Sequence, residues 1–230
     1  MLQHLKQKQA QIMEQNRDFY TSRGTHVYFK DDLINDEIDV EKVVADVEAR
    51  LPEDLLIELE IIVIGWFEEF EERGINAFYK DGILHISNVQ DDEADLFDDI
   101  VHEVSHSLEP VYGYEIYGDQ KVKDEFLEKR RHLHSLLTNN GHNVPLAPFL
   151  DVEYNKKFDE YLFQKIGIEK LRSLCMGVFI NAYAAVSLRE YFATAFTDFY
   201  VNSDHNYLQR ISPQLYKKLT MLHNINKLDK

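Results

Sequence analysis

The segment 91–110 restricts the folding of this chain more than any other part of the sequence. Its apolar residues recur at spacings of four, three and four: Phe97, Val101, Val104 and Leu108. Residues at these spacings form one stripe along a helix, which a globular protein buries against its core. Acidic residues crowd the beginning of the segment, where they favour the positive end of a helix dipole, and Pro110 is expected to end the helix. The sequence therefore predicts an amphipathic helix with one buried face.

The same helix carries the sequence His102-Glu103-Val104-Ser105-His106, which has the form H-E-x-x-H. A spacing of four residues places His102 and His106 one turn apart on the same face of the helix. Two imidazoles in this arrangement can chelate one zinc ion, and the glutamate between them serves as a general base in metallopeptidases. The alternative is a surface helix with two solvated histidines. We expect Zn2+ at His102 and His106, with Glu103 as the base.

A zinc ion with a catalytic role needs a third protein ligand and an open fourth position. The longer metzincin motif, H-E-x-x-H-x-x-G-x-x-H, contains a third histidine ligand. This chain lacks that motif, because Glu109 stands at the position of its glycine and Tyr112 at the position of its last histidine. Glu190 is the candidate carboxylate, since small side chains beside it would let its helix approach a neighbouring helix closely. The spacing Ser187-x-x-Glu190 also fits a capping box, in which the glutamate binds the serine amide. The pattern leaves both roles of Glu190 open.

Two further features accompany the H-E-x-x-H motif. Glu190 opens the sequence Glu-Tyr-Phe-Ala-Thr-Ala-Phe, and Tyr183 lies seven residues before it. With H-E-x-x-H, these features resemble the metallopeptidase domain of anthrax lethal factor and the related Pro-Pro endopeptidases. That family combines H-E-x-x-H with a later helix of the form E-[FY]-F-A-x-[AS]-F and has a tyrosine at the position of Tyr183. The similarity covers roughly residues 98–122 and 181–219.

The resemblance implies a zincin-like fold and assigns a residue to each main role in the site. It implies that zinc is bound by His102, His106 and Glu190, that Glu103 activates the attacking water, and that Tyr183 stabilises the oxyanion. A zinc-dependent endopeptidase with a peptide or protein substrate is therefore expected. The alternative is a non-catalytic metal-binding or structural module that keeps the fold, and a zinc hydrolase acting on other bonds is a third possibility.

Besides mild changes at Ser105 and Glu109, the chain departs from the family pattern in two main respects. The family has an acidic residue four positions after the third ligand, where this chain has Thr194, so a carboxylate that would support the metal ligands is missing there. Asp198 or Glu109 is expected to take its place. Between His106 and Glu190 the chain is much longer than is usual in the family, with the excess at about residues 142–177. This insert is expected to remodel the substrate cleft.

Composition narrows the environment and the partners of the protein. Acidic residues outnumber basic ones by 41 to 25, for a formal charge of -16, which argues against nucleic acid and anionic membranes as partners. Residues 1–20 lack the apolar region of a secretory signal, and no run of eighteen apolar residues occurs. The single cysteine, Cys175, is expected to be buried. These features favour a cytoplasmic protein without a membrane span, and export by a non-classical route is left open.

Periodicity predicts strands in the first part of the chain and helices after them. Strands are expected at 26–29, 57–64, 77–79 and 83–86, the last two forming a hairpin around Asp81-Gly82. Helices are expected at 39–51, 91–110, 123–138, 155–175, 188–201 and 213–222. We predict one two-lobed, zincin-like α+β domain over residues 1–230. Its parts are an N-terminal helix at 1–22, a sheet lobe with the active-site helix at 26–110, and a helical lobe at 111–230.

An extended substrate is expected to add to the strand at 83–87, where backbone hydrogen bonds give affinity and side-chain pockets give specificity. The residues expected to bind it are Ile83, Leu84, His85 and Ile86. The sequence predicts neither the bond that is cleaved nor the oligomeric state.

Overall fold

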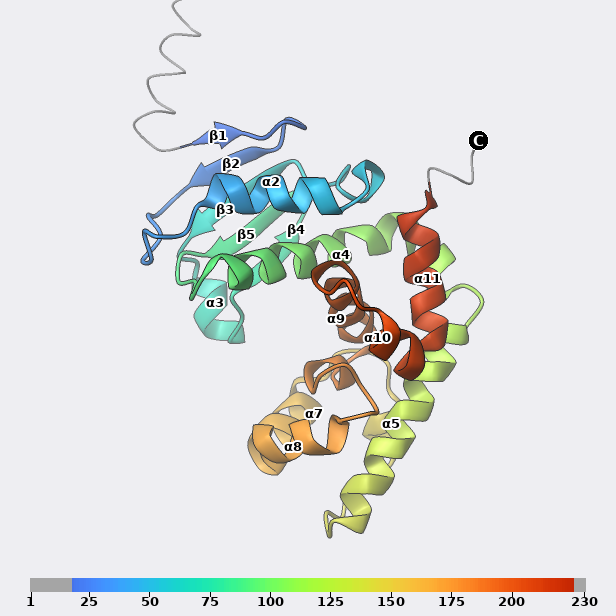
Figure 1. Cartoon of the computed structure of the whole chain (residues 1–230). Coiled ribbons are helices and arrows are strands. Elements are labelled where there is room, and N and C mark those ends of the chain that lie inside the picture. Colours follow the sequence, from blue (N-terminus) through green and yellow to red (C-terminus); the bar gives the residue numbers. More distant parts are fainter. Residues whose placement is uncertain (1–17, 226–230) are drawn as a thin grey trace, which may run out of the picture. The chain divides into compact units, whose positions relative to one another are not determined.

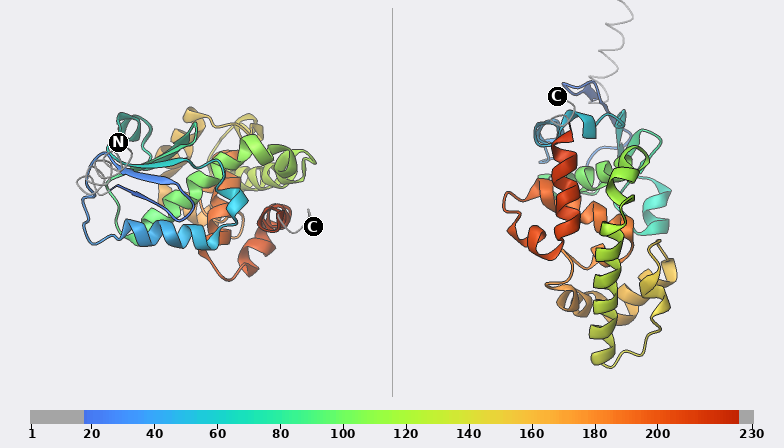
Figure 2. Two further views of the ribbon diagram at one scale, coloured as in Figure 1. Left: turned by 90° about the horizontal axis from the view of Figure 1, so that it is seen from above. Right: turned by 90° about the vertical axis from the view of Figure 1, so that its right-hand side faces the viewer.

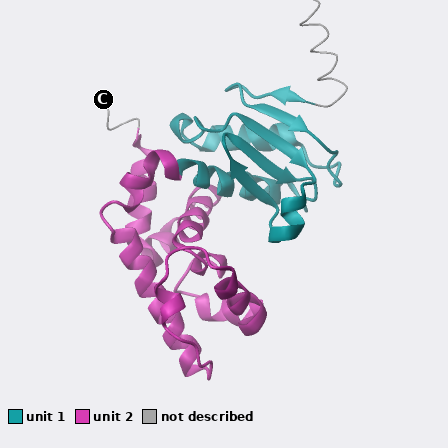
Figure 3. Cartoon of the chain, turned by 180° about the vertical axis from the view of Figure 1, so that it is seen from behind, with its two compact units in different colours: residues 1–108 teal, residues 109–230 magenta. Residues whose placement is uncertain are grey.

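The computed structural model of the chain describes residues 18–225 and shows a mixed α+β protein with one small sheet and many helices (Figure 1). Most of the N-terminal helix predicted at 1–22 lies outside the described residues. The predicted C-terminal end of this helix is wrong, because Phe19–Tyr20 form strand β1, which pairs antiparallel with β2 (His26–Phe29). Aromatic side chains fit such a ladder well, and the pairing overrides the local helical pattern. By their internal contacts the residues divide into two compact units, Met1–Leu108 and Glu109–Lys230 (Figure 3).

The first unit is built on a five-stranded mixed sheet in the order β1-β2-β3-β5-β4. The remaining strands are β3 (Ile61–Gly65), β4 (Ala77–Lys80) and β5 (Ile83–Ser87). Strands β2, β3 and β5 are parallel, while β1 and β4 are antiparallel edge strands. Strand β3 buries Ile62 and Ile64 completely, whereas Ile61 and Val63 on its other face are only partly buried. The predicted hairpin is confirmed, since Asp81 and Gly82 both have positive φ, as a two-residue turn of this kind requires.

The strand predicted at 57–64 begins later than expected. A short 3-10 helix, η1 (Glu53–Leu55), precedes it, and the amide of Leu59 donates to the carbonyl of Leu56 in the following turn. Ile57 is 69% exposed, so the apolar run at this position does not mark a buried strand. Strand β3 starts only at Ile61, where pairing with β2 begins.

Two helices of the first unit lie along one face of the sheet (Figures 1 and 2). Helix α2 (Val40–Arg50) begins at Asp39, whose side chain accepts the amide of Lys42, and it buries Val40, Val43, Val44 and Val47. Helix α4 (Glu93–Tyr117) buries the predicted stripe, because Phe97, Val101, Val104 and Leu108 are at most 7% exposed. Lys42 of α2 forms an ion pair with Glu93 of α4. The short helix α3 (Glu68–Arg73), which the sequence pattern did not predict, ends at Gly74 with φ of 64°.

Helix α4 continues past Pro110, so the predicted end at that residue is wrong. Proline has no N–H for the carbonyl four residues earlier and therefore disfavours the interior of a helix. The turns after Pro110 are held by another interaction, because the hydroxyl of Tyr117 donates to Oε1 of Glu109 at 2.7 Å. That partly buried hydrogen bond spans the last turns of α4 and supports them.

The second unit is helical. Its described elements are α5 (Lys121–Asn139), α6 (Ala147–Leu150), α7 (Lys156–Glu160), η2 (Tyr161–Gly167), α8 (Ile168–Cys175), η3 (Tyr183–Ala185), α9 (Leu188–Val201), α10 (Asn206–Ile211) and α11 (Pro213–His223). The helix predicted at 155–175 is three segments, with a π-helical stretch in the middle and Gly167 at φ of 88° before α8. Cys175 is 1% exposed, as expected. No helix among residues 18–225 is long and apolar enough to cross a membrane.

Candidate metal centre

The two histidines of H-E-x-x-H lie one turn apart on α4. Their ring centroids are 5.1 Å apart and the rings are inclined by 81°, and both side chains are partly exposed. The apolar stripe of α4 is buried, so the helix has a fixed rotation that leaves the histidine face available. His102 and His106 are therefore arranged as the i and i+4 pair that the sequence predicts.

Glu103 occupies a different environment from its two neighbours in the motif. It is 9% exposed, and its Oε2 accepts the backbone amide of Tyr79 in β4 at 2.9 Å. Strand β4 is an edge strand of the sheet, so this amide points away from β5 and toward α4. One oxygen of the Glu103 carboxylate is thus fixed by the sheet edge.

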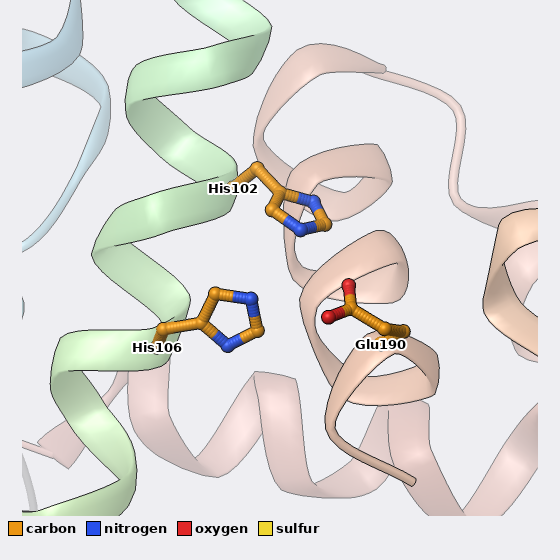
Figure 4. Close-up of side chains that lie close together, drawn as sticks. All are labelled: His102, His106 and Glu190. Atoms are coloured by element: carbon orange, nitrogen blue, oxygen red, sulfur yellow. The ribbon is translucent and has the colours of Figure 1, made fainter. Parts of the chain in front are cut away.

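Glu190 lies in the first turn of α9. The hydroxyl of Ser187 accepts the amide of Glu190 at 3.2 Å and caps the helix, which is the serine half of the predicted capping box. The Glu190 carboxylate lies close to the imidazoles of His102 and His106 (Figure 4). Each of the three side chains offers one ligand atom, and these atoms all lie within 4.8 Å of one another.

This group of side chains could hold a metal ion. Two imidazole nitrogens and one carboxylate oxygen form a common donor set for zinc, and three protein ligands leave the fourth position open. Donor atoms around a tetrahedral zinc ion lie about 3.4 Å apart, so atoms within 4.8 Å of one another need to approach by at most about 1.4 Å to reach that geometry. No second group of this kind occurs within residues 18–225.

Glu109, expected to support the metal ligands, links the end of α4 to the start of α9. Its Oε1 accepts the hydroxyl of Tyr117, and its Oε2 forms an ion pair with Nε of Arg189, the residue before Glu190. Burial raises the pKa of Tyr117 well above its ordinary value, and the nearby carboxylate of Glu109 raises it further. Tyr117 therefore keeps its proton and stays a donor. The described contacts of Glu109 therefore hold the first turn of α9 and do not go to an imidazole.

The two other residues expected near the ligands differ in position. Thr194 is 5% exposed and lies one turn after Glu190 on α9. Asp198 lies eight residues after Glu190, which corresponds to about 12 Å along a helix axis. Its Oδ1 accepts the side-chain amide of Asn202 at 2.8 Å, and burial raises its pKa. The expectation that Asp198 replaces the missing carboxylate is wrong, because it belongs to the far end of the helix.

The expectation that substrate adds to β5 is also wrong. Strand β5 lies between β3 and β4 and is paired on both sides, so it offers no open edge. Leu84 and Ile86 are 0% exposed and belong to the core. Ile83 and His85 are partly exposed, but the His85 ring is stacked on Phe78 at 4.3 Å, and burial lowers its pKa. The sequence pattern identified the strand but could not reveal its neighbours.

Tyr183, the candidate oxyanion donor, is the first residue of η3, just before α9. Its ring is 38% exposed and lies 6.5 Å from the ring of Phe163. The hydroxyl is therefore carried by a short, ordered segment that leads directly into the helix of Glu190.

The sequence reasoning missed Arg130 of α5, which is 0% exposed. Its guanidinium donates to four backbone carbonyls: those of Ala185, Val186, Pro148 and Asp151. Burial lowers its pKa to about 10, and its guanidinium carbon lies 4.2 Å from the Phe158 ring centroid. Two of the carbonyls immediately precede Ser187, so Arg130 fixes the entry to α9. A signal existed, because Arg130 continues the buried stripe Phe126, Leu133 and Leu137 at helical spacing.

Comparisons with known proteins assign the chain to no family. No protein-family model, no curated protein and no solved structure matches this chain. The resemblance to the lethal factor-like peptidases therefore rests on the motifs themselves.

Binding of Zn2+ to this group is expected to stabilise the protein. At a free zinc concentration of 100 times Kd, the free energy of unfolding should rise by about 2.7 kcal/mol. Glu190→Ala should weaken zinc binding, because it removes one of three donors. Asp198→Ala removes a carboxylate from the same helix and serves as the matched control. Thermal unfolding and competition with a chromophoric chelator measure both, and equal zinc affinity in the two variants would exclude Glu190 as a ligand.

Arg130→Lys is expected to weaken zinc binding about tenfold, as removal of supporting interactions around metal ligands typically does. One ammonium group cannot replace a guanidinium that serves four carbonyls, so the entry to α9 and hence Glu190 would shift. Leu133→Ala is the control for stability, since Leu133 is 0% exposed on the same helix and its truncation should cost about 2 to 5 kcal/mol. If both variants lose zinc affinity alike, Arg130 has only a general structural role.

Proposed function

We propose that this protein is a zinc-dependent endopeptidase similar to the lethal factor-like and Pro-Pro endopeptidases. The observation that carries the proposal is the group of His102, His106 and Glu190, with Glu103 beside it on α4. The sequence motifs and the spatial group agree on the same three ligands, although the third is far from the first two along the chain. In zinc peptidases with this motif, two histidines on one helix bind the metal and the glutamate that follows the first of them acts as the general base.

The chemistry divides between the ion and the residues around it. His102, His106 and Glu190 would hold Zn2+, which when bound supplies Lewis acidity that makes water a stronger acid and polarises a carbonyl. Glu103 is the base that takes a proton from the attacking water and passes it to the leaving amine. The amide of Tyr79 already orients its carboxylate, so little rearrangement is needed during the reaction. Tyr183 donates a hydrogen bond to the oxyanion that develops on the carbonyl oxygen.

The edge strand β4 supports a peptide as the substrate. In an antiparallel pair, alternate residues direct their N–H and C=O groups away from the partner strand. The amide of Tyr79 goes to Glu103 and not to β5, so Tyr79 and Ala77 are the residues that face outward. An extended peptide that pairs with this edge would run beside Glu103 and use the outward backbone groups of Ala77, because the Tyr79 amide is already bound to Glu103. This edge replaces β5 as the proposed binding strand.

Glu103→Gln is expected to lower kcat by about 100- to 10,000-fold, because an amide cannot act as a general base. Zinc content and melting temperature should stay near the wild-type values, since Glu103 is not among the proposed ligands. Assays with a fluorogenic peptide library, together with metal analysis of the same preparations, measure these effects.

The same cleavage assays and metal analysis also distinguish a peptidase from a non-catalytic metal-binding module. A wild-type protein that binds zinc tightly but cleaves no peptide of the library supports the module. A Glu103→Gln variant with undiminished cleavage contradicts the role of Glu103 as the base.

Tyr183→Phe tests the oxyanion donor, because it removes only a hydroxyl and keeps the ring. Loss of one such donor typically lowers kcat by about 100- to 1,000-fold, since the donor acts on charge that exists only in the transition state. KM and zinc content should barely change. Tyr114→Phe is the matched control, because Tyr114 is 85% exposed on α4. Normal turnover with a lowered melting temperature would instead make Tyr183 a packing residue.

A further inference from the structure

A pocket of about 410 Å³ lies in the second unit beside Tyr183. Its lining residues are Phe163, Ile168, Arg172, Met176, Ile180, Asn181, Ala182 and Tyr183. The volume falls within the range of pockets that bind small molecules, and it is large enough for one bulky side chain. The pocket thus offers a defined place for a group of the substrate or another ligand.

The walls of this pocket are mostly apolar. Aliphatic, aromatic or thioether side chains come from all lining residues except Arg172 and Asn181. Three of them are large apolar residues with substantial exposure, since Ile168 is 37%, Met176 is 77% and Tyr183 is 38% exposed. Exposed apolar residues that gather around one hollow mark a binding site more often than scattered ones do.

The charge of the pocket differs from that of the chain. The protein has 41 acidic residues and a formal charge of -16, yet no lining residue is Asp or Glu. The single charged wall residue is Arg172, whose Nη1 lies 3.2 Å from Oε1 of Glu169. A basic side chain would find no carboxylate in the walls and would meet a guanidinium. The wall chemistry therefore favours an apolar occupant.

The position of the pocket connects it with the proposed chemistry. Tyr183 forms one wall and is the proposed oxyanion donor, and the chain continues from it through η3 into α9, which carries Glu190. Phe163, Ile168, Arg172 and Met176 come from the insert at about 142–177. Half of the lining residues thus belong to the segment that makes this chain longer than the peptidases it resembles.

We propose that this pocket binds a large aliphatic or aromatic side chain of the peptide substrate, next to the bond that is cleaved. The proposal rests on the proposed peptidase function and adds the substrate class. The occupant follows from three observations: the volume, the apolar walls without a carboxylate, and the shared residue Tyr183. The insert then determines specificity, and the zinc group determines the reaction.

The test is a set of fluorogenic peptides that differ at one position beside the scissile bond, with Leu, Phe, Gly or Lys there. The wild-type protein should give the highest kcat/KM with Leu or Phe. Met176→Glu places a carboxylate at the exposed rim and should reduce the ratio of Leu to Lys kcat/KM by about tenfold or more. Ile168→Glu should shift the ratio in the same direction and provides a second variant should the first fold poorly.

Leu146→Glu is the matched control, because Leu146 is 41% exposed and does not line the pocket. It adds the same charge and should leave the ratio at the wild-type value. If both pocket variants cleave peptides with the wild-type ratio, the pocket proposal is overturned while the peptidase stands. If the wild-type protein cleaves no peptide of the set, both proposals fail together.

Discussion

The buried guanidinium of Arg130 is the interaction on which the second unit most depends. A charge with no exposed surface has to be compensated inside the protein, and here four backbone carbonyls provide the acceptors. Those carbonyls come from the start of the insert and from the residues just before Ser187. Any arrangement that separated them from Arg130 would leave a buried charge without partners, at a cost of several kcal/mol. The path of the chain into α9 is therefore strongly restricted.

Glu190, the proposed third ligand, is restricted in turn through short, local contacts. Ser187 caps α9, and the ion pair of Arg189 with Glu109 connects its first turn to the end of α4. Tyr117 completes the set by binding the same carboxylate. Functional side chains held on helices by such supporting contacts keep their geometry better than side chains on loops. These contacts restrict the position of the Glu190 carboxylate, which is one of many carboxylates in the chain.

In the proposed peptidase, the first unit contributes the base and an edge for the substrate. The sheet places the amide of Tyr79 against Glu103, so the same edge strand that would pair with a peptide also orients the catalytic carboxylate of the proposal. In the second unit, the pocket beside Tyr183 would select the side chain. In the proposal, backbone recognition, proton transfer and side-chain selection are assigned to β4, α4 and the insert.

The sequence by itself determined the helix of the H-E-x-x-H motif, its buried stripe, the Asp81-Gly82 hairpin and the cap of α9. These features depend on local spacing and local backbone chemistry, which a sequence displays directly. The tertiary structure decided which strands are neighbours, which residues lie close together and which charged residue is buried, because local patterns do not contain this information. The order of strands showed that β5 is paired on both sides, helix length placed Asp198 far from Glu190, and the buried stripe of α5 included a charged residue. Each of these outcomes depends on which distant segments become neighbours, because strand pairing and burial are set by long-range contacts.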